Sequence, residues 1–148
     1  MSMVRCALVK GSLGRVRRWR SRLWRSTTCL ELGSYCGKST VYLGTAARDA
    51  DGQLFAVDHH RGSEEHQLGE QYHDPDLFDA TVQRMDSLPA LRQTLSRAEL
   101  EHWVIPVVAA SAQASKYWTI PLGMVFIDGG HSHQAAMTDY RSWSPHVV

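Results

Sequence analysis

The chain has 148 residues, of which 43% are hydrophobic and 21% are charged, and its formal net charge is +1. These values are typical of one folded domain and exclude a disordered chain or a fibre. No apolar run approaches the roughly 18–20 residues of a membrane-spanning helix. The three cysteines are too few for a disulfide scaffold and form no C-x-x-C pair, so we expect reduced thiols and a cytoplasmic protein.

The first 26 residues form a basic arm, and the remainder forms an acidic body. Residues 1–26 hold eight of the sixteen Lys and Arg residues and no acid, whereas residues 27–148 hold all fifteen Asp and Glu residues and have a net charge of −7. In the arm, apolar residues at near-helical spacing between arginines predict an amphipathic helix: Leu13, Val16, Trp19, Leu23 and Trp24. We expect this helix to pack on the domain; an organellar transit peptide and a nucleic-acid-binding arm are the alternatives.

A strand, a glycine turn, a helix and a second strand follow the arm. Thr28–Leu32 are predicted to form a strand that runs into Gly33, and a helix is predicted over Ser39–Arg48. Gly52 suits the turn after this helix, and Leu54–Asp58 predict the next strand. The order strand, helix, strand indicates a βαβ unit.

The polar segment 59–102 is predicted to hold two helices. Asp74 and Pro75 are typical of an N-cap and a first helical residue. The first helix has an apolar stripe and ends at a proline: Phe78, Val82, Met85 and Pro89. The second has leucines at wider helical spacing: Leu91, Leu95 and Leu100.

Histidine and acidic side chains crowd the first part of this segment: His59, His60, Glu64, Glu65, His66, His73, Asp74 and Asp76. Nitrogen and oxygen ligands of this kind suit a divalent metal. We interpret them as a solvated polar cap and assign no metal ligand; a bound divalent metal is the alternative.

Two more strands and a last helix complete the chain. Trp103–Val108 predict a strand at a sheet edge, because Pro106 cannot donate to a ladder. Leu122–Asp128 (LGMVFID) contain a continuous apolar run and predict a strand buried on both faces. A helix is expected to open at Ser132, with an apolar stripe that ends near a proline: Ala136, Tyr140, Trp143 and Pro145. The alternation of strands and helices predicts an α/β fold with a mainly parallel sheet, and no strand is expected after the last helix.

The turn from Glu31 to Thr40 (ELGSYCGKST) carries the main functional signal. A strand that runs through glycines into a helix presents main-chain N–H groups to a ligand. A phosphate-binding loop requires four residues between its glycines, but Gly33 and Gly37 enclose three. A dinucleotide-binding turn requires a different glycine spacing, although Asp58 at the end of the next strand suits a ribose in such folds.

The pattern Glu-x-Gly-x-x-x-Gly-x-Ser, followed by an acid at the end of the next strand, resembles the class I S-adenosylmethionine-dependent methyltransferases. The later segment Phe126–Ser132 (FIDGGHS) resembles a bacterial branch of that superfamily, in which a strand ends Ile-Asp-Gly-x-His. The resemblance covers residues 27–143 and implies a Rossmann-like three-layer sandwich. Four of the usual seven strands are predicted, so we expect residues 27–148 to form a shortened domain of this kind.

The resemblance also implies roles for individual residues. Glu31 would meet the ammonium group of S-adenosylmethionine, Asp58 the ribose diol, and His59 and Ser111 the adenine. Asp128 would face the methyl group and, with His131, is the candidate to take a proton from the acceptor. The other residues assigned to cofactor binding belong to the turn: Gly33, Ser34, Tyr35, Gly37 and Ser39.

These assignments imply S-adenosylmethionine-dependent methyl transfer to a small molecule, with activity in question because strands are missing. A non-catalytic protein that kept the cofactor pocket is the alternative, and a nucleotide-binding phosphate loop comes third. We expect no nucleic-acid partner. The strand that ends at Asp128 would leave an open apolar edge, so we expect a homodimer through it and through Ser132–Trp143.

Overall fold

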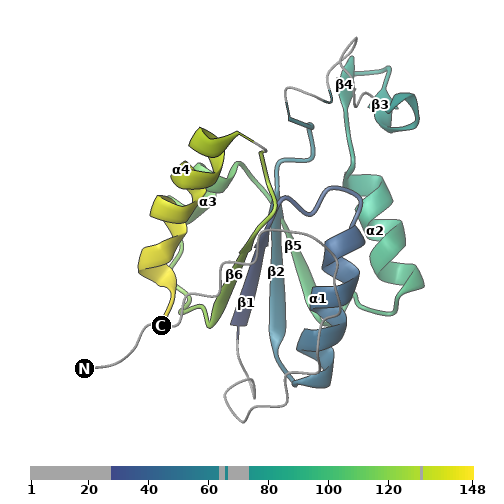
Figure 1. Ribbon diagram of the computed structural model, residues 1–148. Helices are drawn as coiled ribbons and strands as arrows, with labels where there is room; N and C mark the ends of the chain where they lie inside the picture. The colour runs from purple at the N-terminus through teal and green to yellow at the C-terminus, as the bar shows by residue number, and fades with distance from the viewer. Residues whose placement is uncertain (1–27, 64–65, 67–73, 131) are drawn as a thin grey trace.

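The computed structural model describes residues 28–63, 66, 74–130 and 132–148 (Figure 1). The basic arm, residues 1–26, lies outside this part of the chain, as do His131, Glu64, Glu65 and His73. Among the described residues, no helix has the length and apolar character needed to cross a membrane.

Four parallel strands form the central sheet, in the order β5-β2-β1-β6. The strands are β1 (Thr28–Leu32), β2 (Gln53–Asp58), β5 (Val104–Val108) and β6 (Met124–Ile127). Residues 28–32 of β1 pair with residues 53–57 of β2, and all of β5 pairs with residues 54–58 of β2. The strand that contains Pro106 is at the sheet edge, as predicted, where a missing N–H costs no ladder bond.

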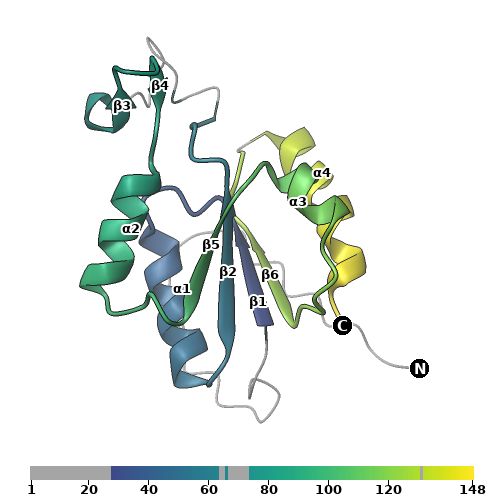
Figure 2. The same ribbon diagram turned by 180° about the vertical axis from the view of Figure 1, so that it is seen from behind.

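Helices cover both faces of the sheet, which confirms the three-layer sandwich (Figures 1 and 2). Helices α1 (Lys38–Asp49) and α2 (Leu88–Arg97) lie on one face, and α3 (Ser111–Lys116) and α4 (His133–Trp143) lie on the other. Successive side chains of a strand point to opposite faces. Cys29 of β1 therefore packs in the α1–α2 core, whereas Leu30 and Leu32 pack against the α3–α4 layer around Trp143.

The predicted helix behind Pro75 is wrong. Asp74 is an N-cap as predicted, since its side chain accepts the N–H of Asp76, but only a 3₁₀ turn follows, Pro75–Leu77. A short hairpin of β3 (Phe78–Asp79) and β4 (Arg84–Met85) comes next. Phe78 and Met85, which were assigned to one helical stripe, face each other across the hairpin as a strand pair. Met85 is seven positions after Phe78, which is the spacing of two helical turns, but here the same spacing brings the two side chains together across a hairpin.

The helical boundary at Pro89 is also wrong, because the proline lies in the first turn of α2 instead of ending a helix. A proline is tolerated there, since the first helical N–H groups have no partner within the helix. Leu91 and Leu95 are buried on the face that packs on the sheet, and Leu100 is buried just after the helix. α3 was not predicted.

The last helix begins as predicted: the Ser132 side chain accepts a hydrogen bond from the Ala135 N–H. The chain then returns to the sheet, because Val147 forms a parallel bridge with Leu122 and the N–H of Val148 donates to the Leu122 carbonyl at 2.9 Å. One isolated bridge therefore forms after the last helix, next to the residues that precede β6, although no strand was expected there. β6 is less buried than predicted, since Val125 is its only buried residue.

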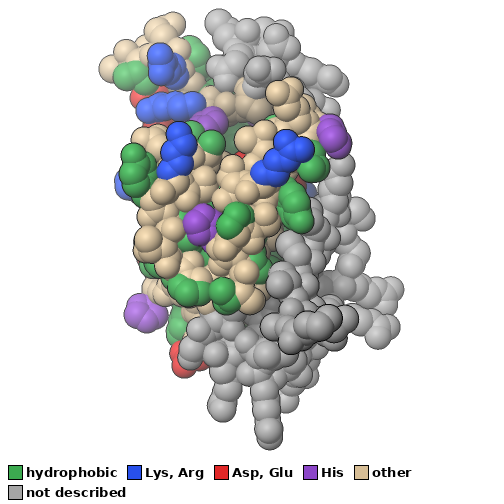
Figure 3. All heavy atoms as spheres, turned by 90° about the vertical axis from the view of Figure 1, so that its left-hand side faces the viewer, with side chains coloured by type: hydrophobic (Ala, Val, Ile, Leu, Met, Phe, Trp, Pro, Cys, Tyr) green, Lys and Arg blue, Asp and Glu red, His purple; other side chains and the backbone are tan. Residues whose placement is uncertain are grey.

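The outer face of the α3–α4 layer carries Lys, Arg and His side chains with hydrophobic side chains scattered between them (Figure 3). Tyr140, which was predicted to belong to the buried stripe of α4, is 36% exposed, whereas Trp143 is fully buried.

Candidate functional site

A cavity of about 400 Å³ lies at the carboxyl ends of β1, β2, β5 and β6. This volume is within the usual range for small-molecule sites, and the carboxyl edge of a parallel sheet is their usual place. Eight of the predicted site residues line it: Gly33, Ser34, Tyr35, Ser39, Asp58, His59, Ser111 and Asp128. Four polar lining residues were missed: Lys38, Ser63, His66 and Asp139.

Asp58 is held at the end of β2 by two main-chain donors. Its Oδ2 accepts the N–H of Tyr35 at 2.8 Å, and its Oδ1 accepts the N–H of His60 at 2.7 Å. A carboxylate has about four acceptor positions, so each oxygen keeps one for a ligand. The carboxylate is thus fixed in orientation and still able to accept two hydrogen bonds from adjacent hydroxyl groups.

Gly33, just after β1, packs closely against the main chain just after β6. Its φ is +86°, and a Cβ atom there would lie 2.5 Å from the Asp128 carbonyl oxygen and 2.7 Å from Gly129 Cα. The glycine is therefore required because the main chain after β6 occupies the adjacent space. This packing places Asp128 next to the glycine turn at the cavity wall.

Two residues of the predicted site do not line the cavity. Gly37, with φ +93°, faces α2, and a Cβ atom there would lie 2.9 Å from Leu91 Cδ1 and 3.0 Å from Thr94 Cγ2. A phosphate-binding loop would direct this position to its ligand instead. The structure therefore gives Gly37 a packing role between α1 and α2.

Glu31 is the second such residue. Its side chain is fully buried on the α1 face, where the Thr40 hydroxyl donates to its Oε2 at 2.6 Å. Among the described residues, its Oε1 has no hydrogen-bond partner. Burial raises the pKa of this carboxyl to about 7, partly offset by hydrogen bonds from Ser39 and Thr40. Glu31 therefore lies behind the turn, and near pH 7 its neutral and charged forms are present in similar amounts.

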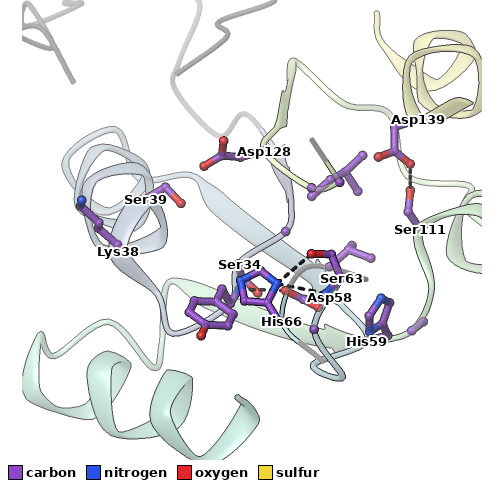
Figure 4. A pocket seen from close by; sticks show the side chains of 18 residues that line it. Ser34, Lys38, Ser39, Asp58, His59, Ser63, His66, Ser111, Asp128 and Asp139 are labelled. Carbon is purple, nitrogen blue, oxygen red and sulfur yellow. Dashed lines mark hydrogen bonds between the residues drawn. The ribbon is translucent and has the colours of Figure 1, made fainter. Parts of the chain in front are cut away.

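Ser34 and the start of α1 line the cavity. The Ser34 side chain is 1% exposed, and within the described part of the chain its hydroxyl has no hydrogen-bond partner. A buried hydroxyl without a partner is costly, so a ligand that bonds to it would be stabilised. Lys38 and Ser39, the first two residues of α1, lie further to one side, with Asp128 near Ser39 (Figure 4).

His66 and Tyr35 lie against each other at the cavity, with ring centroids 5.1 Å apart. The His66 Nδ1 lies 2.7 Å from the Ser63 hydroxyl and accepts the Ser63 N–H at 3.3 Å (Figure 4). Because Nδ1 accepts this main-chain N–H, a neutral His66 carries its proton on Nε2.

The histidine-rich segment is not simply a solvated cap. His60 is 1% exposed, and its Nδ1 lies 2.8 Å from the Ser87 hydroxyl at the start of α2. Burial lowers the pKa of this imidazole, so it is neutral at pH 7. Among the described residues, no three His, Cys, Asp or Glu side chains are close enough together to hold a metal ion.

Asp139 is the most informative residue that the sequence analysis missed. It comes from α4, and its Oδ1 accepts the Ser111 hydroxyl at 2.5 Å (Figure 4). One sequence signal for it exists: Asp139 precedes the buried Trp143 by four residues and therefore shares its helical face. An acid on the face that packs on the sheet indicates a special role.

Residues 30–148 match the model of a family described as a methyltransferase domain. The fold is similar to the O-methyltransferase NovP, with a TM-score of 0.60 and 14% identity over 82% of this chain and 52% of that one. It is also similar to an rRNA methylase from Streptococcus thermophilus (TM-score 0.53, 11% identity, 84% and 57% covered). A third similar structure is an S-adenosylhomocysteine-bound methyltransferase from Podospora anserina (TM-score 0.54, 12% identity, 81% and 40% covered). The chain spans about half the length of the solved structures it matches.

Proposed function

Because the chain belongs to the family of methyltransferase domains, we propose that it binds S-adenosylmethionine in the cavity and transfers the methyl group to a small molecule. The observation that carries the proposal is Asp58, a carboxylate held by two main-chain N–H groups with one acceptor position left on each oxygen. Two adjacent hydroxyl groups of a ribose are the donors that match it.

The remaining polar groups of the cavity fit the other parts of this ligand. The Ser34 hydroxyl, which has no hydrogen-bond partner among the described residues, and the cationic Lys38 suit the carboxylate of the amino-acid part. Glu31 precedes Ser34 by three residues and lies behind the turn. In its charged form it would favour the ammonium group of the amino-acid part. His59 and Ser111 lie on the opposite side of Asp58, where the base would be bound (Figure 4).

S-adenosylmethionine supplies an electrophilic methyl group on a sulfonium. The chain's own task is to hold the acceptor in line and to take its proton where the acceptor has one. We assign this role to Asp128, because it lines the cavity at the tip of β6, beside Gly33. His131, the other candidate base, lies outside the described residues.

Isothermal titration with S-adenosylhomocysteine, ATP plus Mg²⁺, and NAD tests the proposal. We expect S-adenosylhomocysteine to bind and the other two not to bind. Tight Mg²⁺-dependent binding of ATP that is lost in Lys38→Ala would instead support the phosphate-loop hypothesis. Binding of S-adenosylhomocysteine without methyl transfer to any acceptor in a small-molecule panel would support a non-catalytic cofactor-binding protein.

A small-molecule acceptor is favoured over a nucleic acid by charge. Residues 27–148 have a net charge of −7, and two further carboxylates, Asp128 and Asp139, line the cavity with Asp58. Phosphate backbones bind where Lys and Arg gather. Salt-sensitive binding of RNA or DNA to the full chain would contradict this part of the proposal.

The proposed homodimer forms through the edge of β6. Within the described residues, β6 pairs with β1 and, beyond the Leu122–Val147 bridge, its other edge has no strand beside it. Amide hydrogen exchange at low and high micromolar concentration tests this. We expect residues 124–127 to become protected at high concentration while the other edge strand, β5, does not change; equal behaviour of the two edges, with a constant mass in light scattering, would exclude the dimer.

We place the protein in the cytoplasm because Cys29 and Cys36 are free thiols. Burial raises the pKa of both thiols, which keeps them protonated and unreactive. Localisation of a C-terminally tagged full chain tests this placement, and secretion would contradict it.

A further inference from the structure

His60 joins the end of β2 to the start of α2 through three hydrogen bonds. Its main-chain N–H donates to Asp58 Oδ1 at 2.7 Å, and its carbonyl accepts the N–H of Ser87 at 3.1 Å. Its ring Nδ1 lies 2.8 Å from the Ser87 hydroxyl, and both residues are 1% exposed. His60 therefore contacts the carboxylate that faces the cavity without lining the cavity itself.

The Ser87 hydroxyl bonds to this ring instead of to its own helix. Ser87 is the N-cap of α2, and a serine there normally accepts the N–H of the second or third helical residue. Its side chain makes no such bond to the described helix, and Asp86 Oδ1 accepts the Leu88 N–H instead. The fold gives up a cap bond from serine for the contact with the His60 ring.

The ring fits this place only in its neutral form. In either neutral tautomer Nδ1 has a partner, because the Ser87 hydroxyl can donate to it or accept from it. A charged ring carries a proton on both nitrogens, and among the described residues Nε2 has no hydrogen-bond partner. The start of α2 also places the positive end of a helix dipole beside the ring. Uptake of a proton therefore leaves a buried, charged N–H without an acceptor.

Four charged or titratable groups act on the ring: Asp58 at the end of β2, Asp86 just before α2, and the flanking His59 and Arg61. The two carboxylates favour the charged ring, but burial is the largest effect and lowers its pKa from the ordinary 6.5. Arg61 offsets part of the charge of Asp86, since its Nη1 lies 3.7 Å from Asp86 Oδ2. Stability from the neutral ring is thus fully present above pH 6.5 and is lost as the pH falls through the folded-state pKa.

The main chain of His60 connects this protonation to Asp58. Its φ is +58°, a left-handed conformation that a residue other than glycine keeps where contacts hold it. The two bonds to Ser87 are such contacts. When the ring leaves Ser87, the turn relaxes and Asp58 Oδ1 loses its main-chain donor.

We propose that His60 is a positioning residue, whose buried neutral ring holds the turn that orients Asp58, so that uptake of one proton by the ring weakens ligand binding. The inference rests on the proposed function, because the ligand at Asp58 is the cofactor proposed above. The protein then binds this cofactor near neutral pH and releases it in acid.

Titration with S-adenosylhomocysteine between about pH 8 and about pH 5 tests this inference in the wild type and in His60→Asn. Asparagine tolerates the left-handed conformation, can bond to Ser87 and does not titrate. We expect similar affinities near pH 8, and in acid an additional loss in the wild type of up to about tenfold per pH unit, the slope for one proton. Glu31 and the other titratable groups are common to both proteins, so their effects cancel in the difference. His102→Asn, which changes an exposed histidine outside the cavity lining, is the matched control and should follow the wild type.

The titration of the ring itself, followed by NMR in the wild type, gives a second readout. We expect His60 to titrate at lower pH than the exposed His102, and the affinity to fall at the pH where the His60 ring takes up its proton. If the affinity shows no step at that pH, the inference is overturned, even where His60→Asn fails to fold.

The outcomes separate the two hypotheses. No binding of S-adenosylhomocysteine by the wild type near pH 8 overturns the proposed function. Binding with the same pH dependence in the wild type and in His60→Asn overturns the role of His60 alone. A difference between the two proteins in the pH dependence of unfolding, but not of binding, would show that His60 only supports the start of α2.

Discussion

The main-chain N–H of Tyr35 donates to Asp58 Oδ2 at 2.8 Å, and so joins the turn after β1 to the end of β2. Tyr35 has φ +47° and His60, the second donor to Asp58, has φ +58°. Non-glycine residues rarely adopt this left-handed conformation, and they keep it where surrounding contacts hold it. One carboxylate therefore holds two strained turns and also faces the cavity.

Asp58→Ala is expected to affect both binding and stability. Loss of the carboxylate leaves two main-chain N–H groups without their acceptor, which costs about 1–3 kcal/mol in the free energy of unfolding. The affinity for S-adenosylhomocysteine should fall about ten- to hundredfold. Calorimetry and thermal unfolding measure the two effects. Asp79→Ala, which removes a similar bond to the Thr81 N–H outside the cavity lining, should leave affinity unchanged.

The stability of the fold should depend on the protonation of Glu31. Its pKa is raised from 4.5 to about 7 in the folded state, so its contribution is fully present below pH 4.5 and is lost as the pH rises through 7. Glu31→Gln stays neutral and should gain up to about 3 kcal/mol relative to the wild type between those limits. Urea unfolding at several pH values measures this difference, and the exposed Glu101→Gln is the control. Parallel pH profiles for the wild type and Glu31→Gln would show that Glu31 is charged in the fold.

Gly33→Ala should destabilise the protein by about 2–4 kcal/mol, the combined cost of a left-handed residue and of overpacking. The new methyl group would meet the Asp128 carbonyl, which belongs to the main chain and cannot turn aside. Gly129→Ala is the matched control, since its methyl group would lie 3.4 Å from its nearest described neighbour, Asp139. Similar melting temperatures for Gly33→Ala and the wild type would contradict the close approach of the two turns.

Lys38→Ala should weaken S-adenosylhomocysteine binding a few-fold at low salt and have no effect at high salt. The side chain is exposed, so its attraction for a ligand carboxylate is screened. Titrations at two ionic strengths measure the effect, with the exposed Lys116→Ala as control. A loss that does not depend on salt would mean that Lys38 makes a buried contact with the ligand.

Local patterns in the sequence determined the four strands of the central sheet, the first βα turn and the carboxylates at the strand ends. β1 matches its predicted bounds, and β2 begins one residue earlier than predicted. Short apolar runs such as LFAVD are typical of buried strands, so their positions can be predicted from the local sequence. Asp58 and Asp128 reach one cavity because the carboxyl ends of parallel strands share one edge of a sheet. The resemblance to the methyltransferases implied that both residues belong to one site, and the parallel sheet gives the physical reason.

Tertiary contacts decided the rest. Phe78 and Met85 pair across a hairpin, although their spacing also fits a helix, because an apolar spacing alone does not distinguish the two. Leu91 and Thr94, more than fifty residues further along the chain, occupy the space that a Cβ atom on Gly37 would need. Ser111 donates to Asp139, 28 residues away. Such partners depend on how helices from distant segments pack on the sheet. The sequence alone therefore indicated the kind of site. The packing of α3 against α4 decided that Asp139 also lines the cavity.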